Sequence, residues 1–324
     1  MASEILYDEI PSLDLHQFTK GSQDQKMKFV EELGNAYSNI GFVAVKNHGL
    51  SDAMTENLYS VIKQFFTLDE ATKTKYENEK LAGQRGYIGK GKEHAKGSKV
   101  GDLKEFYHVG QIVEGDDPVK AIYPDNIWPN EVPDFKDAAE LVYKTLENTG
   151  KTILRAIALF LKLDENYFED KVHHGNSILR PIHYFPIEDK EALKKGAVRA
   201  AEHGDINLIT LLMGASAAGL EVKRRDNKWI PITALPDQII VNVGDMLERL
   251  TNDVLKSTIH RVVNPEDSKI STSRYSIPFF MHPRPEMNLT CLQQCITIEN
   301  PKKHEDISAG DFLMERLRDI GLIK

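Results

Sequence analysis

The pattern of apolar residues changes near Gly175, and this change limits the possible folds more than any other feature of the chain. Short apolar segments then alternate with turn-forming residues, which is typical of β-strands joined by tight connections. The predicted strands cover residues 178–185, 198–202, 207–213, 219–223, 229–232, 238–243, 257–263 and 274–281. About eight short strands in succession predict a sandwich or jelly roll.

The first half of the sequence is mainly helical. Apolar residues recur at helical spacing over 23–37, over 51–68 with Ser51 as a predicted cap, and over 133–163. A short strand is expected at 41–45 and a last helix at 310–320. We therefore predict an α+β fold with a mainly β core, a double-stranded β-helix (jelly roll) flanked by N-terminal and C-terminal helices. An N-terminal region, 1–120, and a catalytic region, 121–324, are expected to form one compact unit.

Composition excludes several classes of partner. The chain has 324 residues and a net charge of −8, and an acidic protein is a poor ligand for nucleic acid. We expect no secretory signal and no membrane span, because no apolar stretch approaches about 18 residues. Cys291 and Cys295 lie in strand-like segments and are expected to be ordinary partly buried thiols, consistent with a reducing cytoplasm. A monomer or weak homo-oligomer acting on a small molecule is expected.

Three residues form a candidate metal site. His203 and Asp205 are two apart, so on a strand they face the same side, and His260 lies in a later strand-like segment. Two imidazoles and one carboxylate suit Fe(II), Mn(II), Co(II) or Zn(II) and leave positions open for other ligands. The alternative is a polar turn and an unrelated core histidine. However, His260 is flanked by β-branched residues, where an unpaired imidazole would be costly to bury.

A second group of residues predicts a carboxylate clamp. Arg274 and Ser276 share one face of the strand that follows His260, and Tyr184 is a candidate third donor. The alternatives are a buried ion pair for the arginine and ordinary core packing for the tyrosine. A metal-bound water hydrolase does not need an anchor for a dicarboxylate, so the clamp favours iron over zinc.

The order of motifs along nearly the whole chain resembles the isopenicillin N synthase-like group of Fe(II)/2-oxoglutarate-dependent dioxygenases. The matching segments are 10–15, 40–50, 86–87, 102–106, 203–205, 242–245, 257–262 and 274–276. The resemblance implies iron on His203, Asp205 and His260, and 2-oxoglutarate on Arg274, Ser276 and Tyr184. It also implies O2 as the oxidant, with succinate and CO2 as products and hydroxylation as the default reaction. Ile182 stands where many plant members have Asn, so the co-substrate pocket differs from theirs.

The sequence says less about the substrate. Candidates for the rim of the pocket are Arg85, Tyr87, Phe106, Asn207 and Phe280, although core packing is an alternative for the aromatic residues. Three other functions stay open at this point. The first is an oxidase of the same fold that does not use 2-oxoglutarate, like isopenicillin N synthase or aminocyclopropane oxidase. The second is a non-catalytic binding module, and the third is a zinc hydrolase.

Overall fold

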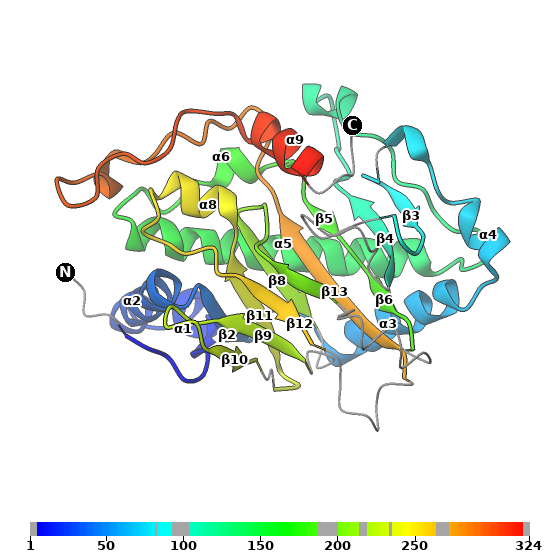
Figure 1. Cartoon of the computed structure of the whole chain (residues 1–324), viewed down its shortest axis with the longest axis horizontal. Coiled ribbons are helices and arrows are strands. Elements are labelled where there is room, and N and C mark those ends of the chain that lie inside the picture. Colours follow the sequence, from blue (N-terminus) through cyan, green and yellow to red (C-terminus); the bar gives the residue numbers. More distant parts are fainter. Residues whose placement is uncertain are drawn as a thin grey trace.

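The computed structural model of the chain describes residues 5–81, 83–92, 104–186, 200–213, 219–232, 235–263 and 272–319 (Figure 1). The helices are α1 (Leu15–Thr19), α2 (Gln23–Asn39), α3 (Asp52–Phe66), α4 (Glu70–Thr74), α5 (Phe135–Phe160), α6 (Glu169–Val172), α8 (Asp245–Leu250) and α9 (Ala309–Asp319), with 3-10 turns η1 (Glu79–Leu81), η2 (Pro118–Ala121) and η5 (Gln293–Cys295). The strands are β1 (Ser12–Asp14), β2 (Phe42–Lys46), β3 (Gly86–Ile88), β4 (Lys104–Gly110), β5 (Ile178–Leu179), β6 (Ile182–Tyr184), β7 (Ala200–His203), β8 (Ile209–Met213), β9 (Leu220–Lys223), β10 (Trp229–Pro231), β11 (Gln238–Val243), β12 (His260–Val262) and β13 (Arg274–Met281).

Two sheets form the centre of the molecule. Within the described part of the chain, the larger sheet has the strand order β1-β2-β11-β8-β13-β5-β4-β3, and β6 pairs with both β13 and β4. The smaller sheet has the order β10-β9-β12-β7. All pairs are antiparallel except β1 with β2, so the sheets follow the antiparallel pattern that the short strands predicted.

Two clusters of buried side chains fill the space between the layers. The larger cluster joins one face of the large sheet to α2, α3 and α5, and Figure 1 shows α5 running behind the strands. The smaller cluster joins side chains of both sheets, including Phe106 and Tyr184 from the large sheet and Val222 and Val262 from the small one. The two sheets therefore pack face to face, and the space between them is the interior of the barrel.

Strand β13 shows which residues face that interior. Ile277, Phe279 and Met281 belong to the helix-side cluster. Because side chains alternate along a strand, Arg274, Ser276, Pro278 and Phe280 face the barrel interior instead. The predicted clamp thus lies on the inner face.

The predicted helices are present, and Ser51 caps α3 by accepting a hydrogen bond from the Met54 N–H at 3.2 Å. The predicted strand 178–185 is divided into β5 and β6, because Pro181 has no N–H to donate to a ladder. The Arg180 N–H still donates to the Pro278 carbonyl at 2.9 Å, so the chain stays against β13 at the break.

Gly150 has a packing role that helix propensity does not predict. A Cβ at this position would lie 2.4 Å from Sδ of Met281 and 3.4 Å from Cδ1 of Leu211. Both of those side chains are fully buried. The missing side chain therefore lets α5 approach β13 and β8 closely.

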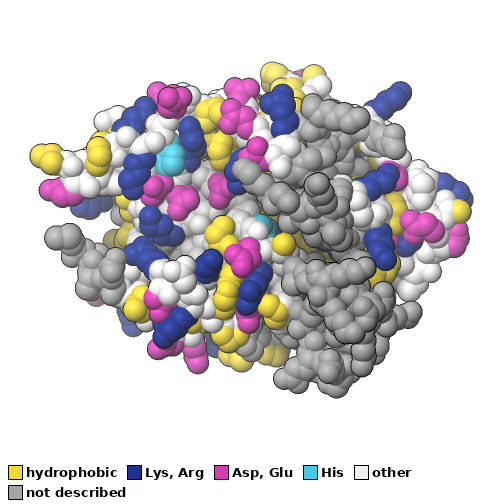
Figure 2. Space-filling view, in the orientation of Figure 1, with side chains coloured by type: hydrophobic (Ala, Val, Ile, Leu, Met, Phe, Trp, Pro, Cys, Tyr) yellow, Lys and Arg dark blue, Asp and Glu magenta, His cyan; other side chains and the backbone are white. Residues whose placement is uncertain are grey.

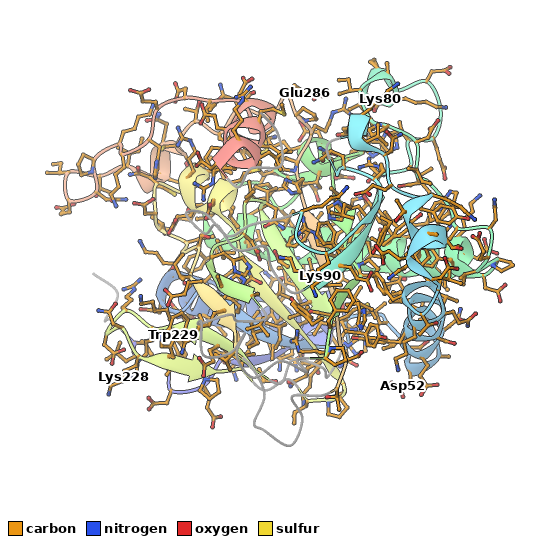
Figure 3. The ribbon with its side chains drawn as sticks, turned by 45° about the vertical axis from the view of Figure 1, so that its right-hand side comes forward. Asp52, Lys80, Lys90, Lys228, Trp229 and Glu286 are labelled. Atoms are coloured by element: carbon orange, nitrogen blue, oxygen red, sulfur yellow. The ribbon has the colours of Figure 1, made fainter. Side chains whose placement is uncertain are left out.

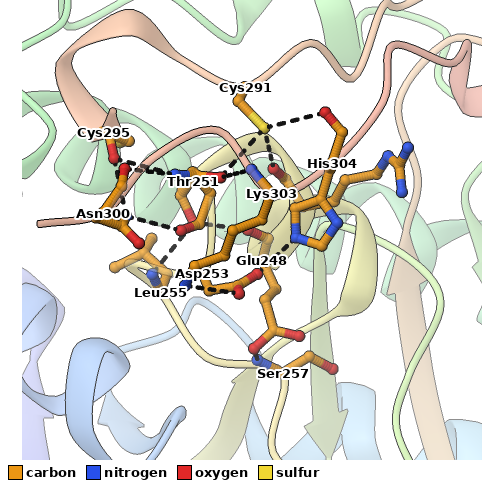
Figure 4. A network of polar contacts seen from close by, with 12 residues as sticks. Glu248, Thr251, Asp253, Leu255, Ser257, Cys291, Cys295, Asn300, Lys303 and His304 are labelled. Carbon is orange, nitrogen blue, oxygen red and sulfur yellow. Dashed lines mark hydrogen bonds and ion pairs between the residues drawn. The ribbon is translucent and has the colours of Figure 1, made fainter. Parts of the chain in front are cut away.

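The prediction of strands around the two cysteines was wrong. Both thiols are free and buried, but their segment contains η5 and irregular backbone. The side chain of Asn300 donates to the Cys295 carbonyl at 2.9 Å, and Cys291 Sγ lies 3.4 Å from the Arg249 carbonyl (Figure 4). Side-chain amides, rather than a neighbouring strand, satisfy the backbone here.

A turn at Asp226-Asn227 joins the antiparallel strands β9 and β10, with Asn227 at a φ of 64°. Trp229 follows this turn, at the opposite side of the molecule from Asp52 at the start of α3 (Figure 3). The guanidinium of Arg261 covers the Trp229 ring at 3.9 Å and connects β12 to this edge of the small sheet.

Among the described residues, none of the helices combines the length and apolar character that crossing a bilayer requires. The larger buried cluster extends from Leu13 to Ala309 and so includes side chains from both expected regions. The boundary at residue 120 stays a prediction.

Candidate functional site

The structure brings the three predicted metal ligands together at the edge of the small sheet. His203 at the end of β7 pairs with His260 at the start of β12, and their rings lie 4.4 Å apart. Asp205 follows β7, and its Oδ1 lies 3.8 Å from Nε2 of His260. One possible ligand atom from each of the three residues lies within 4.8 Å of the others. That spacing fits three ligands around one ion.

The orientation of both imidazoles suits a metal. Nδ1 of His203 lies 2.7 Å from the Ala201 carbonyl, and Nδ1 of His260 lies 3.1 Å from the Thr258 carbonyl. A carbonyl oxygen can only accept, so both Nδ1 atoms carry the hydrogen. The Nε2 atoms are then left with lone pairs that can bind a metal.

Neighbouring side chains also orient the carboxylate of Asp205. Its Oδ2 accepts hydrogen bonds from Thr210 at 2.6 Å and Asn242 at 2.8 Å. Oδ1 is thereby directed towards His260. Gly204 fits the tight space between the ligands, since a Cβ there would lie 3.1 Å from Asp245 Oδ1 and 3.2 Å from Ser257 Oγ. These contacts orient the triad towards a common point.

The protonation states agree with this geometry. Desolvation, followed by the neighbouring His260, lowers the pKa of His203 to about 4. Burial alone would raise the pKa of Asp205, but the two histidines and the hydrogen bonds from Asn242 and Thr210 outweigh burial and lower it. A neutral imidazole and an ionised carboxylate are the forms that bind metal.

A second His/Asp cluster among the described residues is less suited to a metal. It contains Asp117, His173 and His174. The oxygens of Asp117 already accept hydrogen bonds from Arg284 at 2.8 and 3.1 Å, from His174 at 3.0 Å and from the Val119 N–H at 3.0 Å. This carboxylate is therefore saturated by protein donors.

The predicted clamp residues lie together on the inner face of the large sheet. Arg274 on β13 is in register with Tyr184 on β6, and its guanidinium carbon lies 5.1 Å from the centre of the Tyr184 ring. Ser276 faces the same side and is in register with Ile182. Arg274, Ser276 and Tyr184 are all buried, and only a group inside the barrel could reach them.

Comparison with known proteins identifies the family. Residues 10–131 match the family described as non-haem dioxygenase in morphine synthesis N-terminal, and residues 175–283 match the 2OG-Fe(II) oxygenase superfamily. The 2-oxoglutarate-Fe(II) type oxidoreductase ppzD of Metarhizium majus is 33% identical, over 95% of this chain and 94% of that protein. The chain belongs to the 2OG-Fe(II) oxygenase family. The proline hydroxylase buaE of Petromyces alliaceus is also 33% identical, over 95% of this chain and 98% of its own.

Solved structures agree with the fold of this oxygenase. A 2OG-Fe(II) oxygenase family protein from Caulobacter crescentus is 42% identical over 96% of this chain and 99% of its own, with a TM-score of 0.86. A full-length Neurospora crassa protein was crystallised in complex with alpha-KG and thymine. It is 29% identical over 95% of this chain and 96% of that protein, with a TM-score of 0.84. The predicted jelly-roll class, the use of Fe(II) and 2-oxoglutarate, and the oxidoreductase activity are confirmed. A zinc hydrolase is excluded.

Two of the predicted substrate residues lie away from the interior of the oxygenase barrel. Arg85 is 1% exposed, its guanidinium packs against Gly110, and its Nη1 donates to the Gln84 carbonyl at 2.7 Å. Tyr87 is also buried, on the helix-covered face of β3, and its hydroxyl donates to Glu105 at 2.6 Å. Their positions therefore do not support a place on the rim of the pocket. Their substrate role stays a prediction from residue type.

The other three candidates lie near the barrel interior. Asn207 is fully buried, and its side chain donates to Thr210 Oγ1 at 3.0 Å and to the Ile209 carbonyl at 3.2 Å. This amide supports Thr210, which holds Asp205, and the predicted contact of Asn207 with substrate stays a prediction. Phe106 and Phe280 both face the interior, and their contact with substrate also stays a prediction.

A buried polar network lies behind the clamp of the oxygenase. Glu105 on β4 is fully buried, and it accepts hydrogen bonds from Lys73 at 2.6 Å, from Tyr87 at 2.6 Å and from His183 at 2.7 Å. The His183 ring stacks on Tyr275 at 4.8 Å with an angle of 14°. The network therefore connects β4, β6 and β13 on the face opposite the clamp. No role for His183 could be predicted from the sequence, because its partners come from distant segments.

We expect Glu105→Gln to lower the free energy of unfolding by up to about 3–5 kcal/mol, because it removes the buried carboxylate that pairs with Lys73 at 2.6 Å and leaves that lysine only the exposed Glu70 at 3.2 Å. Urea unfolding at neutral pH measures this loss. Glu114→Gln is the matched control, since Glu114 is exposed and its pair with Lys144 is long, at 3.7 Å.

The pH dependence of the wild type gives a second test of this network. Burial alone would raise the pKa of Glu105, but hydrogen bonds from His183, Lys73 and Tyr87 outweigh burial and lower it. A lowered pKa in the folded state stabilises the protein at neutral pH, and that stability is lost as the pH falls through the folded-state value. Equal unfolding free energies for Glu105→Gln and wild type would contradict the assignment.

Proposed function

We propose that the oxygenase hydroxylates a small organic molecule at an iron held by His203, Asp205 and His260. Arg274 and Ser276 would bind the distal carboxylate of 2-oxoglutarate, with Tyr184 beside them. One observation supports this proposal most strongly. Two imidazoles with hydrogen-bonded Nδ1 atoms and one oriented carboxylate lie together at the edge of the barrel, and the inner face of the same barrel holds the buried Arg274.

The residues of the chain have separate tasks in this proposal. Bound iron and 2-oxoglutarate supply the oxidising chemistry, with succinate and CO2 as products. Thr210 and Asn242 fix the carboxylate of Asp205, so the ligand set is preorganised. The apolar side chains between the two sheets exclude water, and Arg274 orients the co-substrate.

Relatives suggest the size of the substrate. A proline hydroxylase and a structure with bound thymine are among the similar proteins, and both names refer to small ring compounds. We infer a substrate of similar size, and no nucleic-acid partner. Lys and Arg side chains are interspersed with Asp and Glu on the face that Figure 2 shows, and the net charge is −8. A monomer or weak homo-oligomer and a cytoplasmic location, consistent with two free thiols, complete the proposal.

The test is product analysis with purified protein, Fe(II), 2-oxoglutarate, O2 and a library of small amino acids, heterocycles and acids. We expect a cognate substrate to give a hydroxylated product and succinate in equal amounts. Product without succinate would indicate the oxidase that does not use 2-oxoglutarate. Failure to bind Fe(II) stoichiometrically would favour the non-catalytic module.

A further inference from the structure

Asp245, at the start of α8, contacts both of the chain segments that carry the candidate metal ligands. Its N–H donates to the Asp205 carbonyl at 2.7 Å. Its Oδ1 accepts a hydrogen bond at 2.6 Å from the hydroxyl of Ser257, which lies three residues before His260. A Cβ on Gly204 would lie 3.1 Å from the same oxygen, so the backbone between the first two ligands packs against this carboxylate. One residue therefore connects the two sides of the site.

Glu248 adds a second contact between α8 and the segment before His260. It lies three residues after Asp245, so both side chains are on the same face of the helix. Its Oε1 accepts a hydrogen bond from the Ser257 N–H at 3.2 Å (Figure 4). The next residue, Thr258, supplies the carbonyl that accepts from Nδ1 of His260. The position of α8 therefore helps to set the orientation of this imidazole.

The C-terminal helix α9 packs against α8 through two contacts. Nη2 of Arg316 donates to Oδ2 of Asp245 at 3.0 Å, and the guanidinium carbon of Arg249 lies 5.5 Å from the centre of the Phe312 ring. The contacts are four residues apart on each helix and follow opposite directions along the chain, so the two helices lie antiparallel with one face of each in contact (Figure 1). The side chains of the ion pair are 21% and 32% exposed, which shields the pair partly from water.

We propose that Arg316 is a positioning residue for the iron site, which acts through Asp245. The arginine holds one oxygen of this carboxylate and Ser257 holds the other, so the carboxylate has a fixed orientation between the two segments that carry the ligands. The C-terminal helix would thus keep the ligands in the geometry that binds the metal, as partners outside the ligand set do in other metal sites. This proposal rests on the proposed function above, because it depends on the same three ligands.

Anaerobic titration with Fe(II) measures the effect on metal binding. Asp245→Ala removes the carboxylate and should weaken Fe(II) binding by about 10- to 100-fold, the range for loss of a residue that supports metal ligands. Arg316→Met should weaken binding less, by about 3- to 10-fold, because the carboxylate and its bond with Ser257 remain. Arg316→Lys keeps the charge and should recover part of this loss. Arg318→Met is the matched control, since Arg318 is exposed on the same helix, and it should bind Fe(II) like the wild type.

A double variant distinguishes positioning of the ligands from simple anchoring of α9. In the Asp245→Asn protein, the amide oxygen can still accept from Ser257 but lacks the charge that pairs with Arg316. Adding Arg316→Met to this protein should lower Fe(II) affinity by less than about twofold more, because the two residues act through one contact. The visible spectrum of the Co(II)-substituted protein depends on ligand geometry, so it should change in Arg316→Met and not in Arg318→Met.

Urea unfolding of each variant establishes that it is folded under the conditions of the titration. An Fe(II) affinity and a Co(II) spectrum equal to those of the wild type in Arg316→Met would overturn the positioning role and leave the proposed function intact. Fully additive losses in the double variant would overturn that role as well, because the arginine would then act through a different contact. Absence of Fe(II) binding by the wild type would instead contradict the proposed function, and the positioning role with it.

Discussion

Asp205→Ala should abolish iron-dependent turnover and lower Fe(II) affinity by more than about 100-fold. Mutation of a residue that only hydrogen-bonds to a metal ligand already lowers metal affinity by about 10- to 100-fold, and loss of a ligand itself should cost more. The change removes the only carboxylate of the triad. It also leaves Thr210 and Asn242 without their shared acceptor, so some stability will be lost. Fe(II) titration under anaerobic conditions and succinate formation measure the two effects.

Asp205→Asn separates metal binding from folding. The amide keeps the shape of the carboxylate and still has an oxygen that can accept from Thr210 and Asn242, but it lacks the negative charge. We expect an unfolding curve close to wild type together with the same loss of iron. Asp117→Asn is the matched control, because Asp117 belongs to the other His/Asp cluster and should leave iron stoichiometry unchanged. Normal Fe(II) binding by Asp205→Asn would rule out the triad.

The sequence predicted the parts of the site that depend on strand periodicity. Arg274 and Ser276 are two residues apart on β13, so both face one side. His203 and Asp205 have the same spacing, but Asp205 follows the end of β7, and its hydrogen bonds from Thr210 and Asn242 orient it. The same rule places Phe280 inside the barrel. What periodicity cannot give is which strand lies opposite. The register of β13 with β6, which sets Arg274 beside Tyr184, depends on the whole sheet.

Two of the predicted substrate residues show the same limit of sequence analysis. Tyr87 has a polar hydroxyl and lies in a segment that matches the family. However, its side chain faces the helices, where Glu105 accepts a hydrogen bond from the hydroxyl. Asn207 was chosen for its nearness to Asp205 in the sequence, and its amide is used entirely inside the protein. The partner of Tyr87 comes from another strand, β4, whereas the partners of Asn207, Ile209 and Thr210, follow it directly in the sequence.

Arg274→Ala should raise the 2-oxoglutarate concentration needed for half-maximal turnover by about 10- to 150-fold, since hydrogen bonds to a charged group contribute about 1.5–3 kcal/mol. The arginine is buried on the inner face of β13, so water cannot replace its donors fully. Fe(II) affinity should stay near the wild-type value, because Arg274 is not a candidate ligand. Succinate formation at varied 2-oxoglutarate concentrations, beside an Fe(II) titration of the same protein, gives both quantities.

Arg274→Lys distinguishes geometry from charge. A lysine retains the positive charge but cannot donate two parallel hydrogen bonds to one carboxylate, so only part of the affinity should return. If charge alone mattered, the lysine variant would match the wild type. Arg284→Ala is a suitable control, because that arginine pairs with Asp117 away from the barrel interior. An unchanged 2-oxoglutarate requirement in Arg274→Ala would mean that another cation binds the co-substrate, and Lys104, in register with Tyr184 on the other side of β6, would then be the residue to replace.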